Sequence, residues 1–394
     1  MTEDFSPAQR IDRRALLAGA AALAAMHATL PSSARAQPAT GPVGKLELVV
    51  AARAPTTPTG LTLSKEGRMF LFMPRFDEHT VFTAGELFPD GRVVPYPSEA
   101  ANRPDPARAA DTLFHVPNGV FDSRNRLWLL DAGLMASSGE PVAGAAKLVC
   151  IDPAANGVLR TISLQAVVTP TSSLNDLRVD LRPGREAAYI TDQGQTGEGA
   201  LIAVDLASGR ALRRLGSHDS TRSVPGLLKI VEGRTLLKRK ADGSTSPIQG
   251  GANGIALSPD GTRLYYSPLM SRQLYAVDTA ALLDESRDDG AVAATVQDLG
   301  EKGLTGGLAA DSRDRIYLSL QEFNGVGRRD PDGQVEVLAN DPRLIWPDTF
   351  WITDEGWLYL SSAQANRRPE HNGGTDRQEP PYAIFRMRID AGPA

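Results

Sequence analysis

The chain has 394 residues, of which 41% are hydrophobic and 23% charged, a composition typical of a globular protein with a sizeable core. Its net charge of −5 argues against a nucleic-acid partner, which would require a basic face. The 37 glycines and 28 prolines favour many short strands joined by turns over an all-helical fold. Because Cys150 is the single cysteine, no intramolecular disulfide can form, and its alternating surroundings predict a buried position.

The N-terminal segment has the pattern of an export signal. Arg13 and Arg14 precede the Ala-rich apolar run 15–25, which is too short to anchor the chain in a bilayer. Small residues at Ala34 and Ala36 then offer a signal-peptidase site. Paired arginines before a mild apolar run resemble a twin-arginine signal, with a general secretory signal as the alternative.

We therefore expect three parts: an export signal at residues 1–36, a Pro/Gly/Thr-rich linker at 37–44 and one domain at 45–394. The signal would engage the twin-arginine translocase, and the mature protein would be periplasmic or secreted. No other apolar run approaches membrane length, so no membrane contact is expected after the signal is removed.

A short segment recurs six times along this predicted domain. Each copy has a polar or small first residue, here called the head, then an alternating apolar run, and then a turn opened by Ser, Asp or Thr. A second apolar strand follows each turn. The copies begin at Thr59, Pro117, Asn175, Asn253, Gly306 and Asp348. Repeats at this spacing predict an all-β fold, a six-bladed β-propeller.

Two irregularities in the repeat make further predictions. The longest interval predicts an insertion near residues 217–251, where the basic run 238–240 is expected to be a solvated turn. The last repeat has three recognisable strands, and an unpaired strand is left over at 46–52. We expect this N-terminal strand to complete the last blade, which removes an open sheet edge and closes the ring.

In a propeller the heads converge on one mouth of the central channel, here called the head mouth. The candidate ligand-binding residues there are Thr59, Asn118, Asn175, Asp176, Asn253 and Asp348. The alternative is that these Asn, Asp and Thr side chains bond their own turns.

The side chains at these heads include few metal ligands and no catalytic triad for hydrolysis. Oxygen ligands would suit Ca²⁺ or Mg²⁺, but Asp348 is the only carboxylate among the heads, with Asp176 one position away. The five histidines show no HxH or HxxxH spacing, and no GxSxG motif occurs. We expect no dedicated metal site and no other cofactor, with a weakly held divalent cation left as the alternative.

An aromatic residue precedes the last head. Trp346 stands two residues before Asp348, where an indole beside a carboxylate could face an amine or a planar ligand. Packing of Trp346 in the core is the alternative.

Several runs resemble the major royal jelly protein/yellow family. They include Arg126–Gly133, Asn175–Asp192, Gly254–Leu269, Asp341–Asp348 and Asn372–Tyr382. The resemblance implies a six-bladed propeller with a small-molecule pocket at one end of the channel, and some members are linked to dopachrome tautomerisation. It adds Phe323, Asn324, Trp346 and Phe350 to the expected ligand contacts. Two heads depart from the usual Asp-Gly pattern, namely Asn253-Gly254 and Gly306-Gly307, and both changes remove a carboxylate.

The sequence thus predicts a protein that binds a small organic molecule, such as an aromatic amine or a catechol-like compound. If it is an enzyme, it would be a dopachrome-tautomerase-like isomerase with Asp348 as general base. One alternative is a gluconolactonase-like, metal-dependent lactone hydrolase, in which Thr59 and Gly306 stand where carboxylates would be wanted. The other alternative is a scaffold without catalysis.

Overall fold

The computed structural model describes residues 45–76, 80–136, 139–240 and 242–394. The predicted signal and linker, residues 1–44, lie outside the described residues. Among the described helices, none is both long and apolar enough to cross a membrane.

Six four-stranded antiparallel sheets make up the described domain, and each sheet is one blade. Blade 1 holds β2 (Gly60–Leu63), β3 (Met69–Phe72), β4 (Ala84–Leu87) and β5 (Val93–Pro95). Blade 2 holds β6 (Asn118–Phe121), β7 (Leu127–Asp131), β8 (Lys147–Asp152) and β9 (Gly157–Ser163). Blade 3 holds β10 (Leu174–Asp180), β11 (Ala187–Asp192), β12 (Ala200–Asp205) and β13 (Ala211–Arg214).

The second half of the chain supplies the other three sheets. Blade 4 holds β18 (Ala252–Leu257), β19 (Arg263–Pro268), β20 (Gln273–Asp278) and β21 (Gln297–Glu301). Blade 5 holds β22 (Thr305–Ala310), β23 (Ile316–Leu320), β24 (Gly325–Arg329) and β25 (Val335–Asn340). Blade 6 holds β26 (Pro347–Ile352), β27 (Trp357–Ser362), β28 (Tyr382–Arg388) and β1 (Glu47–Ala52).

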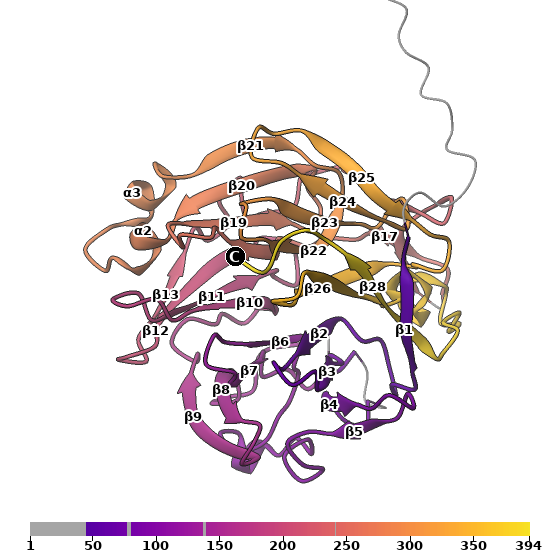
Figure 1. Cartoon of the computed structure of the whole chain (residues 1–394), viewed down its shortest axis with the longest axis horizontal. Coiled ribbons are helices and arrows are strands. Elements are labelled where there is room, and N and C mark those ends of the chain that lie inside the picture. Colours follow the sequence, from indigo (N-terminus) through magenta and orange to yellow (C-terminus); the bar gives the residue numbers. More distant parts are fainter. Residues whose placement is uncertain (1–44, 77–79, 137–138, 241) are drawn as a thin grey trace, which may run out of the picture. The chain divides into compact units, whose positions relative to one another are not determined.

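The innermost strands close into a ring. Each of β2, β6, β10, β18 and β22 contacts the innermost strand of the next blade, and β26 contacts β2 (Figure 1). This closure confirms the predicted six-bladed propeller. The chain meets itself in blade 6, where β1 pairs antiparallel with β28 from Glu47 opposite Arg386 to Ala52 opposite Tyr382. The N-terminal strand therefore completes the last blade, as predicted.

The repeated turn residue has a structural reason. In blades 2 and 5 the turn-opening carboxylates of Asp122 and Asp311 accept hydrogen bonds from two backbone N–H groups of their own turns. Each also binds the arginine directly before the next strand, Arg126 or Arg315. The Asp at these positions therefore holds the turn between the first and second strands of its blade.

The core lies between neighbouring blades and is mostly apolar. Cys150 is buried there as predicted, and burial raises the pKa of its thiol to about 11. Blade 2 also encloses a charge. Lys147 Nζ donates to Asp131 Oδ2 at 2.8 Å and to three backbone carbonyl oxygens, those of Ala109, Thr112 and Ala145.

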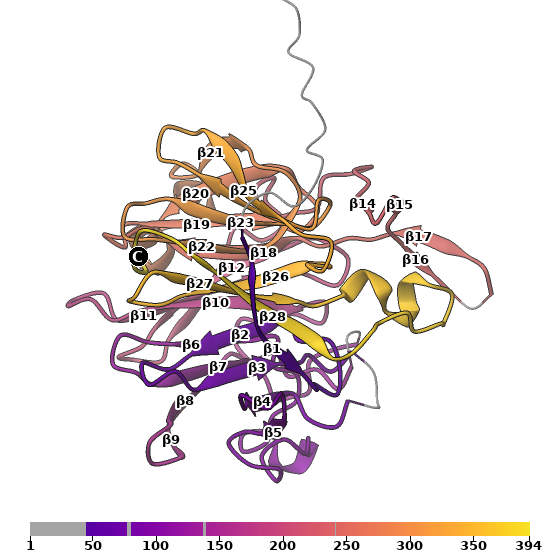
Figure 2. The same cartoon turned by 45° about the vertical axis from the view of Figure 1, so that its right-hand side comes forward.

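The predicted insertion, residues 217–251, lies between blades 3 and 4 and forms two hairpins. The first pairs β14 (Ile230–Val231) with β15 (Arg234–Thr235), and the second pairs β16 (Leu237–Arg239) with β17 (Thr245–Pro247). Figure 2 shows these hairpins on the side of the ring away from the C-terminus. Short helices occur outside the sheets: α2 (Thr279–Leu283), α3 (Asp289–Ala293), η1 (Pro106–Arg108), η2 (Ala365–Arg367) and η3 (Pro369–His371).

Candidate functional site

The heads of four innermost strands carry a β-bulge. In β10, β18, β22 and β26 one extra residue interrupts the pairing with the second strand of the blade. The interruptions lie between Leu174 and Leu177, Ala252 and Gly254, Thr305 and Leu308, and Pro347 and Phe350. In contrast, β2 and β6 pair in continuous register. A bulge redirects side chains out of the pleat, and here it affects the heads Asn175, Asp176, Asn253 and Asp348.

Asp176 is the buried centre of this polar group. Its Oδ1 accepts hydrogen bonds from the Asn118 amide of blade 2 and from the Leu177 N–H. Arg178 binds the same oxygen at 2.8 Å, and its other terminal nitrogen donates to the Leu308 carbonyl oxygen at 2.6 Å. Because Leu308 belongs to blade 5, the Arg178 guanidinium bridges two blades that are not neighbours. It therefore crosses the interior of the ring.

Asp348 in blade 6 has a strongly altered acidity. Burial, followed by the negative charge of Asp176, raises the pKa of Asp348 from 3.8 to about 8. The charge of Lys229 and a hydrogen bond from Trp346 act in the opposite direction and are outweighed. Part of the Asp348 residue stays accessible, whereas Asp176 is buried. Asp348 is thus a carboxyl group that changes its charge near neutral pH.

Lys229 reaches the head mouth from the insertion. Its side chain is fully buried, and its Nζ donates to Gln321 Oε1 at 2.6 Å. The Nζ also lies 5.0 Å from the ring centroid of Trp346, within the range of a cation–π contact. Burial lowers the pKa of Lys229 to about 7, although the charges of Glu322 and Asp348 act to raise it.

A donor without a partner lies beside these groups. Gln321 is buried, and its Nε2 makes no hydrogen bond in the described part of the chain. A Cβ added at Gly306 would lie 2.5 Å from this Nε2 and 3.0 Å from Asp348 Oδ1, so both atoms pack closely against the Gly306 backbone. Because a buried unsatisfied donor costs free energy, this amide is available to a ligand.

Trp346 adopts a backbone conformation that bulky residues rarely take. Its φ is 53°, in the left-handed region. Its carbonyl oxygen accepts a hydrogen bond from the Ala363 N–H at 3.1 Å, which ties it to the end of β27. Residues held in such a conformation cluster at functional sites, and here the conformation places the indole beside Lys229 and Asp348.

The insertion covers the head mouth. Its apolar residues Val231, Leu236 and Ile248 pack in one cluster with Met270, Trp346 and Ala363 of blades 4 and 6. The Ile230 N–H also donates to Glu322 Oε1 at 2.9 Å. A ligand that reaches Asp348 from this side must therefore displace the insertion.

The remaining predicted contacts lie in different places. The Thr59 hydroxyl donates to the Pro117 carbonyl oxygen at 3.0 Å and so links blades 1 and 2. Asn253 is buried, and its carbonyl oxygen accepts from Thr191. Phe323 is 58% exposed and Asn324 follows it with a φ of 48°, in the loop between β23 and β24. Gln321, two residues before Phe323, is the residue of this loop that lies near Asp348 and Lys229.

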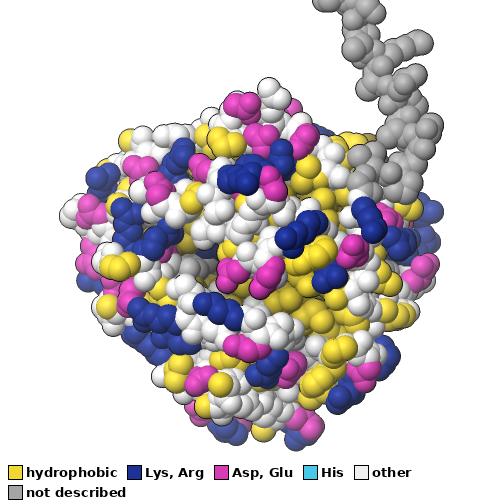
Figure 3. Space-filling view, in the orientation of Figure 1, with side chains coloured by type: hydrophobic (Ala, Val, Ile, Leu, Met, Phe, Trp, Pro, Cys, Tyr) yellow, Lys and Arg dark blue, Asp and Glu magenta, His cyan; other side chains and the backbone are white. Residues whose placement is uncertain are grey.

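Phe350 lines a different cavity, of about 850 Å³, at the opposite end of the ring, here called the turn mouth. Trp351, Phe121 and the C-terminal Ala394 also border it, and the rings of Phe121 and Trp351 lie 6.5 Å apart. Figure 3 shows the face near the C-terminus, with hydrophobic side chains gathered toward its middle. Arg178 borders this cavity too.

Sequence reasoning missed Lys229, Gln321 and the close packing of side chains against Gly306. Lys229 and Gln321 are 92 residues apart in the chain, and no local pattern distinguishes either of them. The Gly306-Gly307 pair was the one available signal, since paired glycines in a strand indicate a bulge or a close backbone approach.

The more buried carboxylate at the heads already has protein partners. Within the described residues, no three His, Cys, Asp or Glu side chains gather in a possible metal site. Of the two carboxylates at the heads, Asp176 is the more buried, and it already binds the Arg178 guanidinium and the Asn118 amide. A cation would have to displace both of these groups.

Solved structures resemble the fold. A gluconolactonase from Xanthomonas campestris matches with a TM-score of 0.51 and 14% identity, covering 87% of this chain and 89% of its own. Regucalcin, a calcium-binding protein from Agrobacterium tumefaciens, matches with a TM-score of 0.51 and 16% identity, covering 89% and 96%. At such low identity these matches show a common propeller architecture.

Sequence relatives define the family. Major royal jelly protein 3 of Apis mellifera is 28% identical over 193 residues, which are 47% of this chain and 32% of the bee protein. Protein yellow of Drosophila yakuba is 27% identical over 238 residues, 56% of this chain and 41% of the fly protein. The matches therefore span less than half of these relatives. The family model of the major royal jelly proteins matches residues 119–389, and the chain belongs to the major royal jelly protein family.

Proposed function

We propose that the protein binds a small organic molecule, an aromatic amine or a catechol-like compound, at the head mouth and moves a proton on it. The observation that carries this proposal is the group formed by Asp348, Lys229 and the unpartnered Gln321 amide beside Gly306. A carboxyl and an amine that both titrate near neutral pH are suited to general acid–base catalysis.

The proposed reaction is a tautomerisation of the ligand. The Asp348 carboxylate takes a proton from a carbon next to a carbonyl group, and the Lys229 ammonium gives a proton to the carbonyl oxygen. The ligand keeps its atoms and electrons, so no oxidant is needed. Proton exchange with solvent then restores both side chains.

The unpartnered amide and the indole have complementary roles in this proposal. Gln321 Nε2 donates to a ligand oxygen and holds it near Lys229. Trp346 packs against the planar part of the ligand. The insertion, which covers the mouth, opens to admit the ligand and closes again to exclude water.

Thermal unfolding with a panel of catechols, indoleamines and lactones tests the binding step. A ligand present at a hundredfold its dissociation constant adds about 2.7 kcal/mol to the stability of the folded protein. Stabilisation by a catechol or an indoleamine supports the proposal. No stabilisation by any compound favours a scaffold, and stabilisation by lactones alone favours the lactonase alternative, which has only the shared architecture in its support.

Two matched variants test the site. Asp348→Asn should abolish tautomerisation, because the base is lost. Asp354→Asn removes the same charge from the same blade, but from a residue at the turn mouth, and should leave turnover unchanged. Retained turnover in Asp348→Asn would contradict the assignment of the base.

A further inference from the structure

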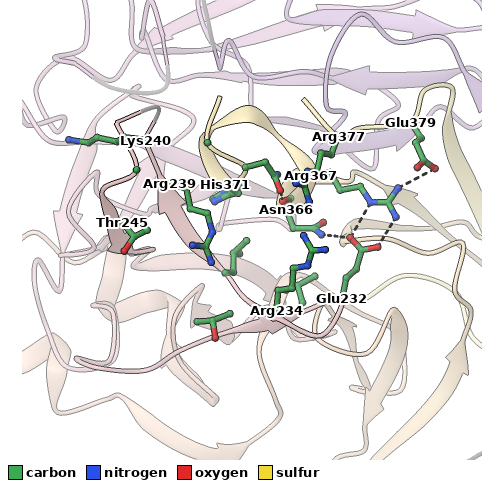
Figure 4. A pocket seen from close by; sticks show the side chains of 16 residues that line it. Glu232, Arg234, Arg239, Lys240, Thr245, Asn366, Arg367, His371, Arg377 and Glu379 are labelled. Atoms are coloured by element: carbon green, nitrogen blue, oxygen red, sulfur yellow. Dashed lines mark hydrogen bonds and ion pairs between the residues drawn. The ribbon is translucent and has the colours of Figure 1, made fainter. Parts of the chain in front are cut away.

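A second cavity lies outside the channel. It has a volume of about 680 Å³ and is bordered by the two hairpins of the insertion and by the segment between β27 and β28 (Figure 4). We call it the insertion pocket. Its walls come from parts of the chain more than a hundred residues apart, so only the folded protein contains it.

The insertion pocket is basic in a chain whose net charge is negative. Two carboxylates and five Lys or Arg side chains line it: Glu232, Glu379, Arg234, Arg239, Lys240, Arg367 and Arg377. Both carboxylates form ion pairs with Arg367. Arg367 donates to the two oxygens of Glu232 at 3.0 and 2.6 Å and lies 3.3 Å from Glu379.

Four cations of the pocket are left without a carboxylate. The side chains of Arg234, Arg239, Lys240 and Arg377 make no ion pair or hydrogen bond with any residue that the structure describes. Arg239 is half-buried, and Figure 4 shows the guanidinium groups of Arg234 and Arg239 pointing into the space between the hairpins and the 366–379 segment. The basic run at 238–240 was predicted to be a solvated turn, but Lys238 and Arg239 lie in strand β16 and Arg239 is half-buried, while Lys238 and Lys240 are exposed as expected.

The wall of the pocket also contains a hydrogen-bond acceptor to which no described residue donates, the side-chain oxygen of Asn366. Asn366 is 8% exposed, and its Oδ1 is buried without a hydrogen-bond partner in the described residues. Its Nδ2 donates to Glu232 at 2.7 Å, which fixes the orientation of the amide. A ligand that satisfies this oxygen must carry a hydroxyl or N–H group.

We infer that the insertion pocket binds a small hydroxylated molecule that bears a phosphate or carboxylate group. Guanidinium groups recognise such oxyanions through paired, charge-assisted hydrogen bonds, here from Arg234 and Arg239. The hydroxyl group donates to Asn366 Oδ1. A bound molecule would tie the insertion to the 366–379 segment. The inference does not depend on the proposed chemistry in the channel.

Isothermal titration of the full-length protein with glucose 6-phosphate, gluconate, inorganic phosphate and glucose tests the inference. Saturable binding of glucose 6-phosphate or gluconate, weaker at high salt, is the expected result. Binding of glucose as tight as that of the charged compounds would overturn the role of the oxyanion. Equal affinity for inorganic phosphate would overturn the role of the hydroxyl group, and no binding of any probe would overturn the inference as a whole.

Variants locate the binding. Arg239→Gln should weaken binding about tenfold, since a charge-assisted hydrogen-bond pair is lost. The control Lys238→Gln removes the same charge from the same strand, at a residue that does not line the pocket, and should bind as the native protein does. An equal loss in both variants would show unspecific attraction and overturn the inference. Asp348→Asn should bind the same probes normally, which separates this site from the channel.

Discussion

Two lysines of this protein are buried to a similar degree but in very different surroundings. Lys147 in blade 2 is 2% exposed and has a carboxylate and three carbonyl oxygens as acceptors. Lys229 at the head mouth is 0% exposed, and its partners among the described residues are the side-chain oxygen of Gln321 and the face of Trp346. The first ammonium is fully compensated and serves the fold. The second is undercompensated, which is why its pKa falls to about 7.

The comparison shows that burial alone does not separate structural from chemical charges. The difference lies in the number and kind of partners. A buried charge with several acceptors or a counter-ion serves the structure, whereas a buried charge with few partners has a pKa shifted toward neutral pH. The bulged heads of blades 3 to 6 provide the undercompensated region, and the regular heads of blades 1 and 2 do not.

The largest effect is expected for Lys147→Met. This change leaves the carboxylate of Asp131 buried without its cation, and the loss of one partner of a buried pair costs about 3–5 kcal/mol. Urea-induced unfolding measures the change in stability. A loss of stability below about 1 kcal/mol would contradict the view that Lys147 stabilises the fold.

Lys229→Met should have a much smaller effect on stability. Methionine keeps much of the apolar stem and removes an amine whose burial is poorly compensated, so the free energy of unfolding should change by about 1 kcal/mol or less. Tautomerisation, in contrast, should be lost because the proton donor is gone. A destabilisation equal to that of Lys147→Met would remove the distinction between the two lysines.

The pH dependence of stability should show both titrating groups. Asp348, with its pKa raised from 3.8 to about 8, keeps in the folded state a proton that the unfolded chain has lost, so it makes stability fall between about pH 4 and 8. Lys229, with its pKa lowered from 10.5 to about 7, loses in the folded state a proton that the unfolded chain keeps. It makes stability rise between about pH 7 and 10.5.

Thermal melts between pH 4 and 10 measure this profile. The Asp348→Asn variant should show a smaller fall, while burial of Asp176, which also raises the pKa of that carboxyl, leaves a remainder. Lys229→Met should show a smaller rise, because burial also lowers the pKa of Lys302. A fall of unchanged size in Asp348→Asn would assign the fall to another group, such as Asp176.

The smallest effect on stability is expected for Gly306→Ala. The added methyl group would push against Gln321 Nε2 and Asp348 Oδ1, and the cost of moving these side-chain ends is partly offset by the lower entropy of the unfolded chain. We expect a change of about 1 kcal/mol or less together with a clear loss of ligand affinity. Gly327→Ala in the same blade is the control, because its Cβ would approach no atom closer than 3.1 Å. Equal affinity in both variants would show that the surroundings of Gly306 are not part of the binding site.

The repeat, the turn residues and the leftover strand were readable along the chain because each is a local pattern. Alternation over four to six residues marks a strand, Asp122 and Asp311 mark turns that they themselves cap, and a strand without a neighbour must find an open edge. The expectation that Asp176 and Asp348 lie near each other came from the predicted ring of six blades, which places the heads at one mouth.

Which side chains contact one another in the candidate site is known only from the folded ring. An extra residue in β26 is visible only against the register of β27, and the contact between Lys229 and Gln321 joins the insertion to blade 5. Acidity near pH 7 arises only when burial and neighbouring charges act together at one place. Such effects depend on distances in space, which closure of the ring sets and local sequence does not encode.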